Sequence, residues 1–272
     1  MHAGTLSVKD IFGRDCRYAV PLFQRPYVWS VKSQWRPLWQ DITRLAEVIV
    51  EGDEPRPHFL GAIVLDQIPH PAGHLEKRLV VDGQQRLTTL QILLEAFADV
   101  CVESSVEPYD RALLRLTRND DPISNDPDEE FKVWPTNADR THFRAVMRAS
   151  GPAEVLDHFG RSRGAKWVDH PIGDAYLFFH RSVDAWLRHG GDARPRAHAL
   201  YSAVRDHIRV VGIDLKAEDD AQVIFETLNA RGTPLLPSDL VKNYLFHRER
   251  QAGGAIDKLY RDYWAPFDER SE

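Results

Sequence analysis

One stretch of the sequence decides the fold: LVVDGQQRLTTL, which runs from Leu79 to Leu90. Its first three residues are apolar and include two β-branched valines, so they predict a buried strand. From Leu87 onward, apolar residues recur at the spacing of a helix face: Leu87, Leu90, Leu94, Phe97, Ala98 and Cys101. Asp82-Gly83 lies between the two patterns and favours a turn, because glycine tolerates positive φ and lets a ligand approach the backbone.

A strand, a glycine turn and a helix in succession predict an anion site at the start of the helix. The first N–H groups of a helix have no partner within it, and the helix dipole favours a negative charge beside them. Gln84, Gln85 and Arg86 fall in this first turn, so a phosphate group is the expected ligand. The ordinary alternative is that Asp82 caps the helix, the glutamines are solvated and Arg86 pairs with a surface carboxylate.

The composition is that of a soluble globular protein. The chain has 272 residues, with 43% hydrophobic and 28% charged residues, enough for one large domain or two smaller ones. The net charge of −6 excludes a general nucleic-acid binder, so any DNA contact needs a local basic face. Two cysteines without C-x-x-C spacing, no membrane-length apolar run and a charged N-terminus predict a cytoplasmic protein without a membrane partner. The histidines lack zinc-binding spacing, so no metal site is expected from them.

The remaining pattern predicts an α+β fold. Before the central stretch we expect a short helix within 5–17, an amphipathic helix over 33–50, and a strand over 59–66 that enters a hairpin. After residue 104 the pattern becomes helical, with a flexible acidic loop at 119–130 and two extended pieces, at 131–134 and 209–215. The predicted organisation is therefore an α+β core over 1–104, and a mostly helical subdomain over 105–272 that closes a cleft.

The segment QRPYVW, Gln24–Trp29, is held extended by its prolines. An amide, a cation and two aromatic rings on a stiff backbone could grip a phosphate or stack on a base. The alternative is a strand whose Tyr27 and Trp29 fill core space, and for Trp29 both interpretations stay open.

The concentrated basic region of the chain falls on one expected helix. Arg140, Arg144 and Arg148 recur at i, i+4 and i+8 and so share one helix face. Three further cations follow in a glycine-containing loop: Arg161, Arg163 and Lys166. Such a face is commonly only solvated, but here it could also bind the backbone of duplex DNA.

Three blocks of the sequence coincide with a known family. They are QRPYVW at 24–29, DGQQR at 82–86, and FETLN at 225–229 with Gly232 and SDL at 238–240. Together they resemble the N-terminal domain of GmrSD-type modification-dependent restriction proteins, a group with phosphorothioate-sensing members. The resemblance spans nearly the whole chain, and DGQQR is its most specific part. It implies a ParB/sulfiredoxin-like α+β core followed by helices.

The resemblance also implies an activity: hydrolysis of GTP, CTP, UTP or ATP with Mg²⁺, in anti-phage defence that senses modified double-stranded DNA. Matched to the family motif, the catalytic residues would be Asp82, Gln84, Gln85 and Arg86. The nucleotide-binding residues would be Gln24, Arg25, Gly83, Thr88 and Asn229. For DNA we expect Tyr27 and Trp29 to read the modification, and Arg140, Arg144 and Arg148 to bind the backbone.

The family usually continues into a C-terminal His-Asn-His (HNH) nuclease domain, and nothing in this chain supplies one. The nuclease would therefore lie in a longer protein or in a separate chain, and the oligomeric state stays open. Neither cysteine lies beside the arginine motif, so sulfiredoxin-like repair chemistry is not expected. Two other functions remain: a ParB-like nucleotide-gated DNA-binding module that does not hydrolyse nucleotide, and a scaffold for a partner nuclease.

Overall fold

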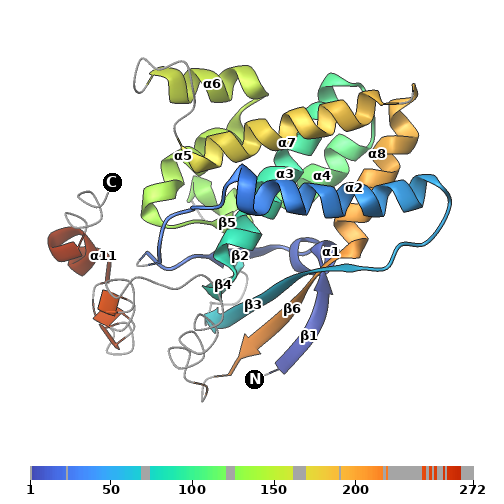
Figure 1. Ribbon diagram of the computed structural model, residues 1–272. Coiled ribbons are helices and arrows are strands. Elements are labelled where there is room, and N and C mark those ends of the chain that lie inside the picture. The colour runs from blue at the N-terminus through green and yellow to red at the C-terminus, as the bar shows by residue number, and fades with distance from the viewer. Residues whose placement is uncertain are drawn as a thin grey trace.

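The computed structural model describes residues 2–22, 24–68, 74–120, 126–161, 170–189, 191–216 and 219, and, farther along, 241–242, 245–246, 248–249, 254 and 256–264. A mixed sheet lies at one side of the molecule, and most of the helices gather over it (Figure 1). The block 220–240, which carries the FETLN word, Asn229 and Gly232, lies outside the described residues, as do Arg163 and Lys166.

In the described part of the chain, the sheet has six strands in the order β1-β6-β3-β4-β2-β5. Their bounds are β1 His2–Ser7, β2 Cys16–Ala19, β3 His58–Ile68, β4 Glu76–Asp82, β5 Val133–Trp134 and β6 Ile208–Leu215. The pairs β1/β6 and β3/β4 are antiparallel, and β3/β6, β2/β4 and β2/β5 are parallel. β4 has a neighbour on each side, which confirms the buried strand predicted at 79–81 and the hairpin that precedes it.

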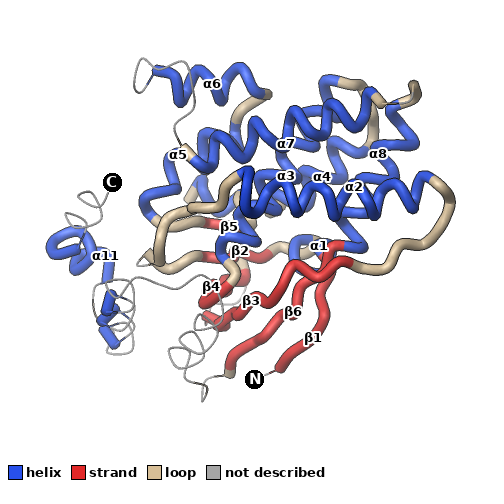
Figure 2. The backbone as a smooth tube through the Cα atoms, in the orientation of Figure 1, coloured by secondary structure: helices blue, strands red, loops and turns tan. Residues whose placement is uncertain are grey.

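The described part of the chain contains nine α-helices. They are α1 Val8–Phe12, α2 Arg36–Val50, α3 Gln84–Glu103, α4 Tyr109–Thr117, α5 Asn137–Arg148, α6 Pro152–Arg161, α7 Pro171–Arg188, α8 Ala193–Ser202 and α11 Ile256–Leu259. π-Helical turns precede α2 (Val31–Trp35) and follow α8 (Ala203–His207), and a 3₁₀ turn spans Pro127–Glu130. The helices and the six-stranded sheet confirm the α+β class (Figure 2). Within the described part of the chain, no helix combines the length and apolar character of a membrane span.

The long helix α3 forms the centre of the core. The sequence predicted a single apolar face, but the residues from Leu87 to Ala98 are buried on every side of the helix. A helix with this burial lies inside a protein rather than on its surface. Two of its buried polar side chains bond to α4 and the residue after it: Gln91 donates to the Leu116 carbonyl, and Glu95 receives two bonds from Arg118.

The N-terminal strand was not predicted, since 5–17 read as a short helix. The helix is confined to α1, because Ser7 and Asp10 form a capping box at its start and the chain leaves it at Gly13. The preceding residues form β1, which pairs with β6 some 200 residues along the chain, from His2↔Asp214 to Ser7↔Arg209. The sheet thus takes strands from both sides of residue 104, and the division of the chain there stays a prediction.

Candidate functional site

The DGQQR word forms the connection between β4 and α3. Asp82 is the last residue of β4, and Gly83 is the N-cap of α3 with φ +95° and ψ 9°. This left-handed conformation favours glycine. A Cβ atom at Gly83 would also lie 2.6 Å from Ile63 Cγ2 and 3.1 Å from Ile63 Cα in β3. Both backbone conformation and space therefore require glycine at this position.

The start of α3 has no side-chain cap among the described residues. The side chains of Ser7 and Asp192 accept bonds from first-turn N–H groups of α1 and α8, whereas α2, α4 and α5, like α3, begin without a side-chain cap. The suggestion that Asp82 caps α3 is therefore wrong, because Gly83 occupies the N-cap position. A helix of 20 residues thus begins with N–H groups that a bound anion can satisfy.

Arg86 is fixed against the neighbouring strand and also forms an ion pair with the partly exposed carboxylate of Asp82. Its Nε donates to the Leu60 carbonyl at 3.0 Å, and its Nη1 donates to the Ala62 carbonyl at 2.9 Å. Gly61 between them has φ +109°, and a Cβ atom there would lie 3.0 Å from Arg86 Nε. The ion pair with Asp82 measures 3.6 Å from Arg86 Nη1 to Asp82 Oδ2. Arg86 is thus oriented by two backbone bonds that leave its Nη2 group for a ligand.

The two glutamines of the motif bind the extended segment 24–29. Gln84 Nε2 donates to the Arg25 carbonyl at 3.0 Å, across 59 residues of sequence. Gln85 makes two bonds, from its Nε2 to the Pro26 carbonyl at 3.0 Å and from Val28 N–H to its Oε1 at 2.9 Å. The expected proximity of the two motifs is therefore observed.

These contacts separate residues that fix the segment from residues that can meet a ligand. Gln85 is buried with both amide atoms bonded, and buried Gln24 donates to the Val80 and Val81 carbonyls at 2.8 and 3.0 Å. Thr88 is also buried, one turn into α3. Gln84 and Arg25 are only partly buried, and among the described residues Gln84 Oε1 and the Arg25 guanidinium have no partner.

This difference predicts unequal effects on stability. Gln85→Ala is expected to lower the free energy of unfolding by about 1–3 kcal/mol, because the Pro26 carbonyl and the Val28 N–H both lose their partner. Gln84→Ala removes one bond near solvent and is expected to cost well under half of that. Thermal or urea unfolding of the two variants measures the difference, and equal loss in both would contradict the assignment of Gln85 as a structural residue.

The two aromatic residues expected to read DNA lie in different environments. Tyr27 is 4% exposed, and its ring stacks on Trp35 with centroids 6.5 Å apart. Its hydroxyl bonds to Thr89 Oγ1 at 2.6 Å, and its N–H donates to Asp139 Oδ2 at 2.9 Å. Burial raises the pKa of Asp139 to about 6, against the lowering effect of its hydrogen bonds. Tyr27 is thus a core residue here and offers no open face to a base.

Trp29 instead lines an open, largely apolar pocket of about 880 Å³. Trp35, Trp39 and Phe178 contribute further aromatic rings to this pocket, and Arg181 and Asp174 add charged groups. We call it the tryptophan pocket. The segment that carries Trp29 is also the one bonded to Gln84 and Gln85.

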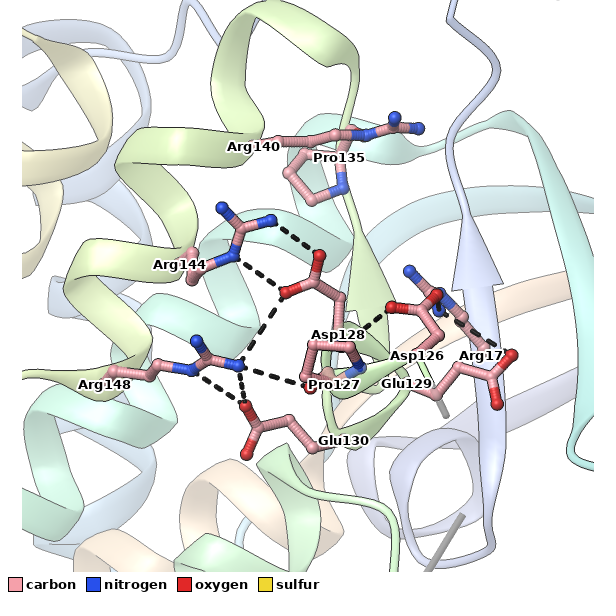
Figure 3. Close-up of polar contacts among 10 residues, drawn as sticks. All are labelled: Arg17, Asp126, Pro127, Asp128, Glu129, Glu130, Pro135, Arg140, Arg144 and Arg148. Atoms are coloured by element: carbon pink, nitrogen blue, oxygen red, sulfur yellow. Dashed lines mark hydrogen bonds and ion pairs between the residues drawn. The ribbon is translucent and has the colours of Figure 1, made fainter. Parts of the chain in front are cut away.

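Arg140, Arg144 and Arg148 do share one face of α5, but Arg144 and Arg148 are already paired with acidic groups of the chain (Figure 3). Arg144 makes two bonds to Asp128, at 2.7 and 2.6 Å, and Arg148 makes two to Glu130 Oε1, at 2.9 and 2.6 Å. The prediction of a flexible loop over 119–130 is wrong for residues 126–130. They form an ordered turn against α5, which we call the acidic turn.

A family model described as GmrSD restriction endonuclease, N-terminal domain, matches residues 8–246. The matched range includes QRPYVW, DGQQR, the arginines of α5 and the acidic turn. No curated protein matches the chain.

Proposed function

The chain belongs to the GmrSD restriction endonuclease N-terminal domain family, and on this premise we propose that it binds and hydrolyses a nucleoside triphosphate at the start of α3. Family membership makes it a domain of a restriction system. The observation that carries the proposal is the start of α3, a long helix without a side-chain cap that follows a glycine turn and has Arg86 in its first turn.

Binding of the triphosphate uses groups that the fold leaves unsatisfied. The first N–H groups of α3 can donate to phosphate oxygens. Arg86 offers Nη2, and Arg25 offers a guanidinium without a partner in the described residues. Two guanidinium groups beside a helix N-terminus can offset much of the charge of a triphosphate.

Hydrolysis requires a water molecule to attack the γ-phosphorus while the bond to the β–γ bridging oxygen breaks. The products are a nucleoside diphosphate and inorganic phosphate, which takes up the oxygen of the water. We assign orientation of this water to Gln84, whose Oε1 can accept its hydrogen bond while Nε2 stays bonded to the Arg25 carbonyl. Gln85, Gln24 and Thr88 would position these groups from the interior.

Asp82 is the carboxylate of the motif that fits a Mg²⁺ ion, because it is partly exposed at the end of β4. Magnesium bound with nucleotide commonly uses only one or two protein carboxylates besides phosphates and water. The ion, when bound, neutralises phosphate charge. Within the described residues, no cluster of three metal-binding side chains occurs, so the phosphates would have to complete the coordination. Asn229 stays assigned to the nucleotide from the family motif alone.

We further propose modified duplex DNA as the partner and an HNH nuclease, in the same protein or in another chain, as the effector. The tryptophan pocket would take the modified group, and Trp29 rather than Tyr27 would contact it. Arg140, Arg144 and Arg148 would bind backbone phosphates. Because Gln84 and Gln85 bond to the segment that carries Trp29, occupation of the pocket can shift these side chains and thereby change turnover.

The test is phosphate release from GTP, CTP, UTP and ATP with Mg²⁺, with and without modified DNA. Gln84→Ala is expected to lower turnover by about 10²-fold while the dissociation constant of the nucleotide changes little, because Gln84 acts on the water. Gln40→Ala, an exposed glutamine on α2, is the matched control and should behave as the parent.

Two results would replace the proposal. If the parent binds nucleotide in a calorimetric titration but releases no phosphate with any DNA, the chain is a nucleotide-gated DNA-binding module. If it binds no nucleotide, the motif serves the fold and the chain is a scaffold for its nuclease.

A further inference from the structure

The acidic turn, residues 126–130, occupies the arginines that would bind DNA. Asp128 bridges to Arg144 through two short bonds and lies 3.8 Å from Arg148. Arg148 also donates twice to Glu130 and once to the Pro127 carbonyl, at 3.2 Å. Figure 3 shows both guanidinium groups directed at the turn, with Arg140 directed elsewhere.

These bonds use the chemistry by which arginine holds a phosphate. A guanidinium group binds a carboxylate or a phosphate through two parallel N–H bonds, as Arg144 binds Asp128. Asp128 and Glu130 are two residues apart and serve arginines that are one helical turn apart. The acidic turn therefore presents α5 with anions in place of the phosphates of a DNA strand.

The turn has a buried anchor and a more exposed arm, formed by Asp128 and Glu130. Glu129 is the anchor, since its side chain is 5% exposed, bonds to Lys77 at 2.6 Å and lies 3.9 Å from buried Arg17. The arginines that the arm binds reach solvent, with side-chain exposure of 37% for Arg144 and 44% for Arg148. The Arg148–Glu130 pair, in which Glu130 is 35% exposed, is of the kind that contributes little to stability and is weakened by salt, whereas Asp128 is 15% exposed and its two parallel bonds hold Arg144 more firmly. Both pairs include a partly exposed arginine that salt and phosphate can reach, so the arm carboxylates can leave it while Glu129 keeps the turn in place.

The arginines themselves are supported from beneath by aromatic rings. Phe131 and Trp134 stack with centroids 6.0 Å apart and planes 3° apart. The guanidinium of Arg144 lies 5.4 Å from the Trp134 centroid, and that of Arg148 lies 5.4 Å from the Phe131 centroid. Cation–π contacts of this kind hold a guanidinium without using its N–H groups. Both arginines can thus stay in position when the carboxylates move.

We propose that the acidic turn is an intramolecular competitor of DNA: Asp128 and Glu130 hold Arg144 and Arg148 until backbone phosphates replace them. This inference rests on the proposed function, which supplies duplex DNA as the partner. The consequence is that α5 binds unmodified duplex DNA weakly. Its arginines add phosphate contacts only when another surface of the protein already holds the duplex.

The experiment measures binding of a fluorescent unmodified duplex to the full chain by anisotropy across a range of salt concentrations. The double variant Asp128→Asn with Glu130→Gln is expected to bind about tenfold more tightly than the parent at low salt, because two carboxylates no longer oppose the phosphates. The slope of log K against log salt should become steeper by roughly 1.8, about 0.9 for each of the two further phosphates that the freed arginines neutralise.

The control removes the same charge elsewhere. Asp41→Asn with Asp184→Asn breaks exposed pairs with Arg44 and Arg188 on other helices. It raises the net charge equally, and we expect affinity within about twofold of the parent. Thermal unfolding of every variant confirms that each one is folded.

A third variant tests whether the tighter DNA binding of the double variant depends on Arg144 and Arg148. Adding Arg144→Gln and Arg148→Gln to the double variant should return affinity and salt slope to the values of the parent. If the double variant gains no more than the control, or if the gain survives loss of the two arginines, the inference is overturned while DNA binding as such stands. If no variant binds the duplex, the DNA-binding part of the proposed function fails as well.

Discussion

Replacement of Arg86 by alanine is expected to lower nucleotide turnover by about 10²–10³-fold. The guanidinium group would offset charge on the phosphates during transfer, and loss of one such preorganised donor commonly has an effect of this size. Because Arg86 also donates to the Leu60 and Ala62 carbonyls of β3, the variant should lose about 1–3 kcal/mol of stability as well. Turnover must therefore be measured well below the unfolding temperature of the variant.

A second substitution, Arg25→Ala, separates the loss of turnover from the loss of stability expected for Arg86→Ala. The Arg25 guanidinium has no partner among the described residues, so Arg25→Ala should leave the unfolding temperature unchanged and weaken nucleotide binding. Arg44→Ala on the exposed face of α2 serves as the control for loss of a positive charge. If phosphate release is unchanged in both Arg86→Ala and Arg25→Ala, the nucleotide does not bind at the start of α3, whatever the stability of the two variants.

Gly83→Ala is expected to destabilise the fold by roughly 2–4 kcal/mol. An alanine at φ +95° is strained by about 1 kcal/mol or somewhat more. The added Cβ would also lie 2.6 Å from Ile63 Cγ2 and 3.1 Å from the Ile63 backbone, and overpacking of this kind costs about 1–3 kcal/mol. In a protein of this size, the unfolding temperature should fall by roughly 5–15 °C.

Gly52→Ala is the matched control for backbone strain. Gly52 has φ +90°, close to that of Gly83, but a Cβ atom there would meet nothing within 4 Å. The control should therefore cost only about 1 kcal/mol, and the difference between the variants reports the contact with Ile63. Equal unfolding temperatures would mean that β3 can move away from the turn, and the close packing of β3 on Gly83 would then be incidental.

Local chemistry was enough to predict the centre of this fold. The apolar β-branched run before Asp82 made β4, the glycine made the turn, and the apolar repeat after it made α3. Each of these features depends on residues within a few positions of one another, so the sequence alone carries them. The family of the chain could also be recognised from its sequence motifs, since QRPYVW and DGQQR are short and specific. α2, Arg36–Val50, lies within the range 33–50 expected from the same kind of periodicity.

The tertiary structure decided which side chains of the two motifs are buried and which stay accessible. Gln84 and Gln85 are identical neighbours, yet only Gln85 points inward to Pro26 and Val28, because the helix turns about 100° between them. In the extended segment, Tyr27 is buried and Trp29 lies beside a pocket, although residues two positions apart would share a face of a regular strand, so the sequence could not say which of the two would be covered.

Partners far apart in the sequence were likewise decided only by the folded chain. The arginines of α5 formed a basic face in the sequence, but the acidic turn that pairs with them precedes the helix by a strand, and charge repeats do not identify their counterions. β1 was missed for the same reason, since its partner β6 follows about 200 residues later and a six-residue strand has little pattern of its own. Local propensity fixes which elements form, whereas the pairing of distant groups depends on how those elements pack, and in this protein the packing determines which cations remain for a ligand.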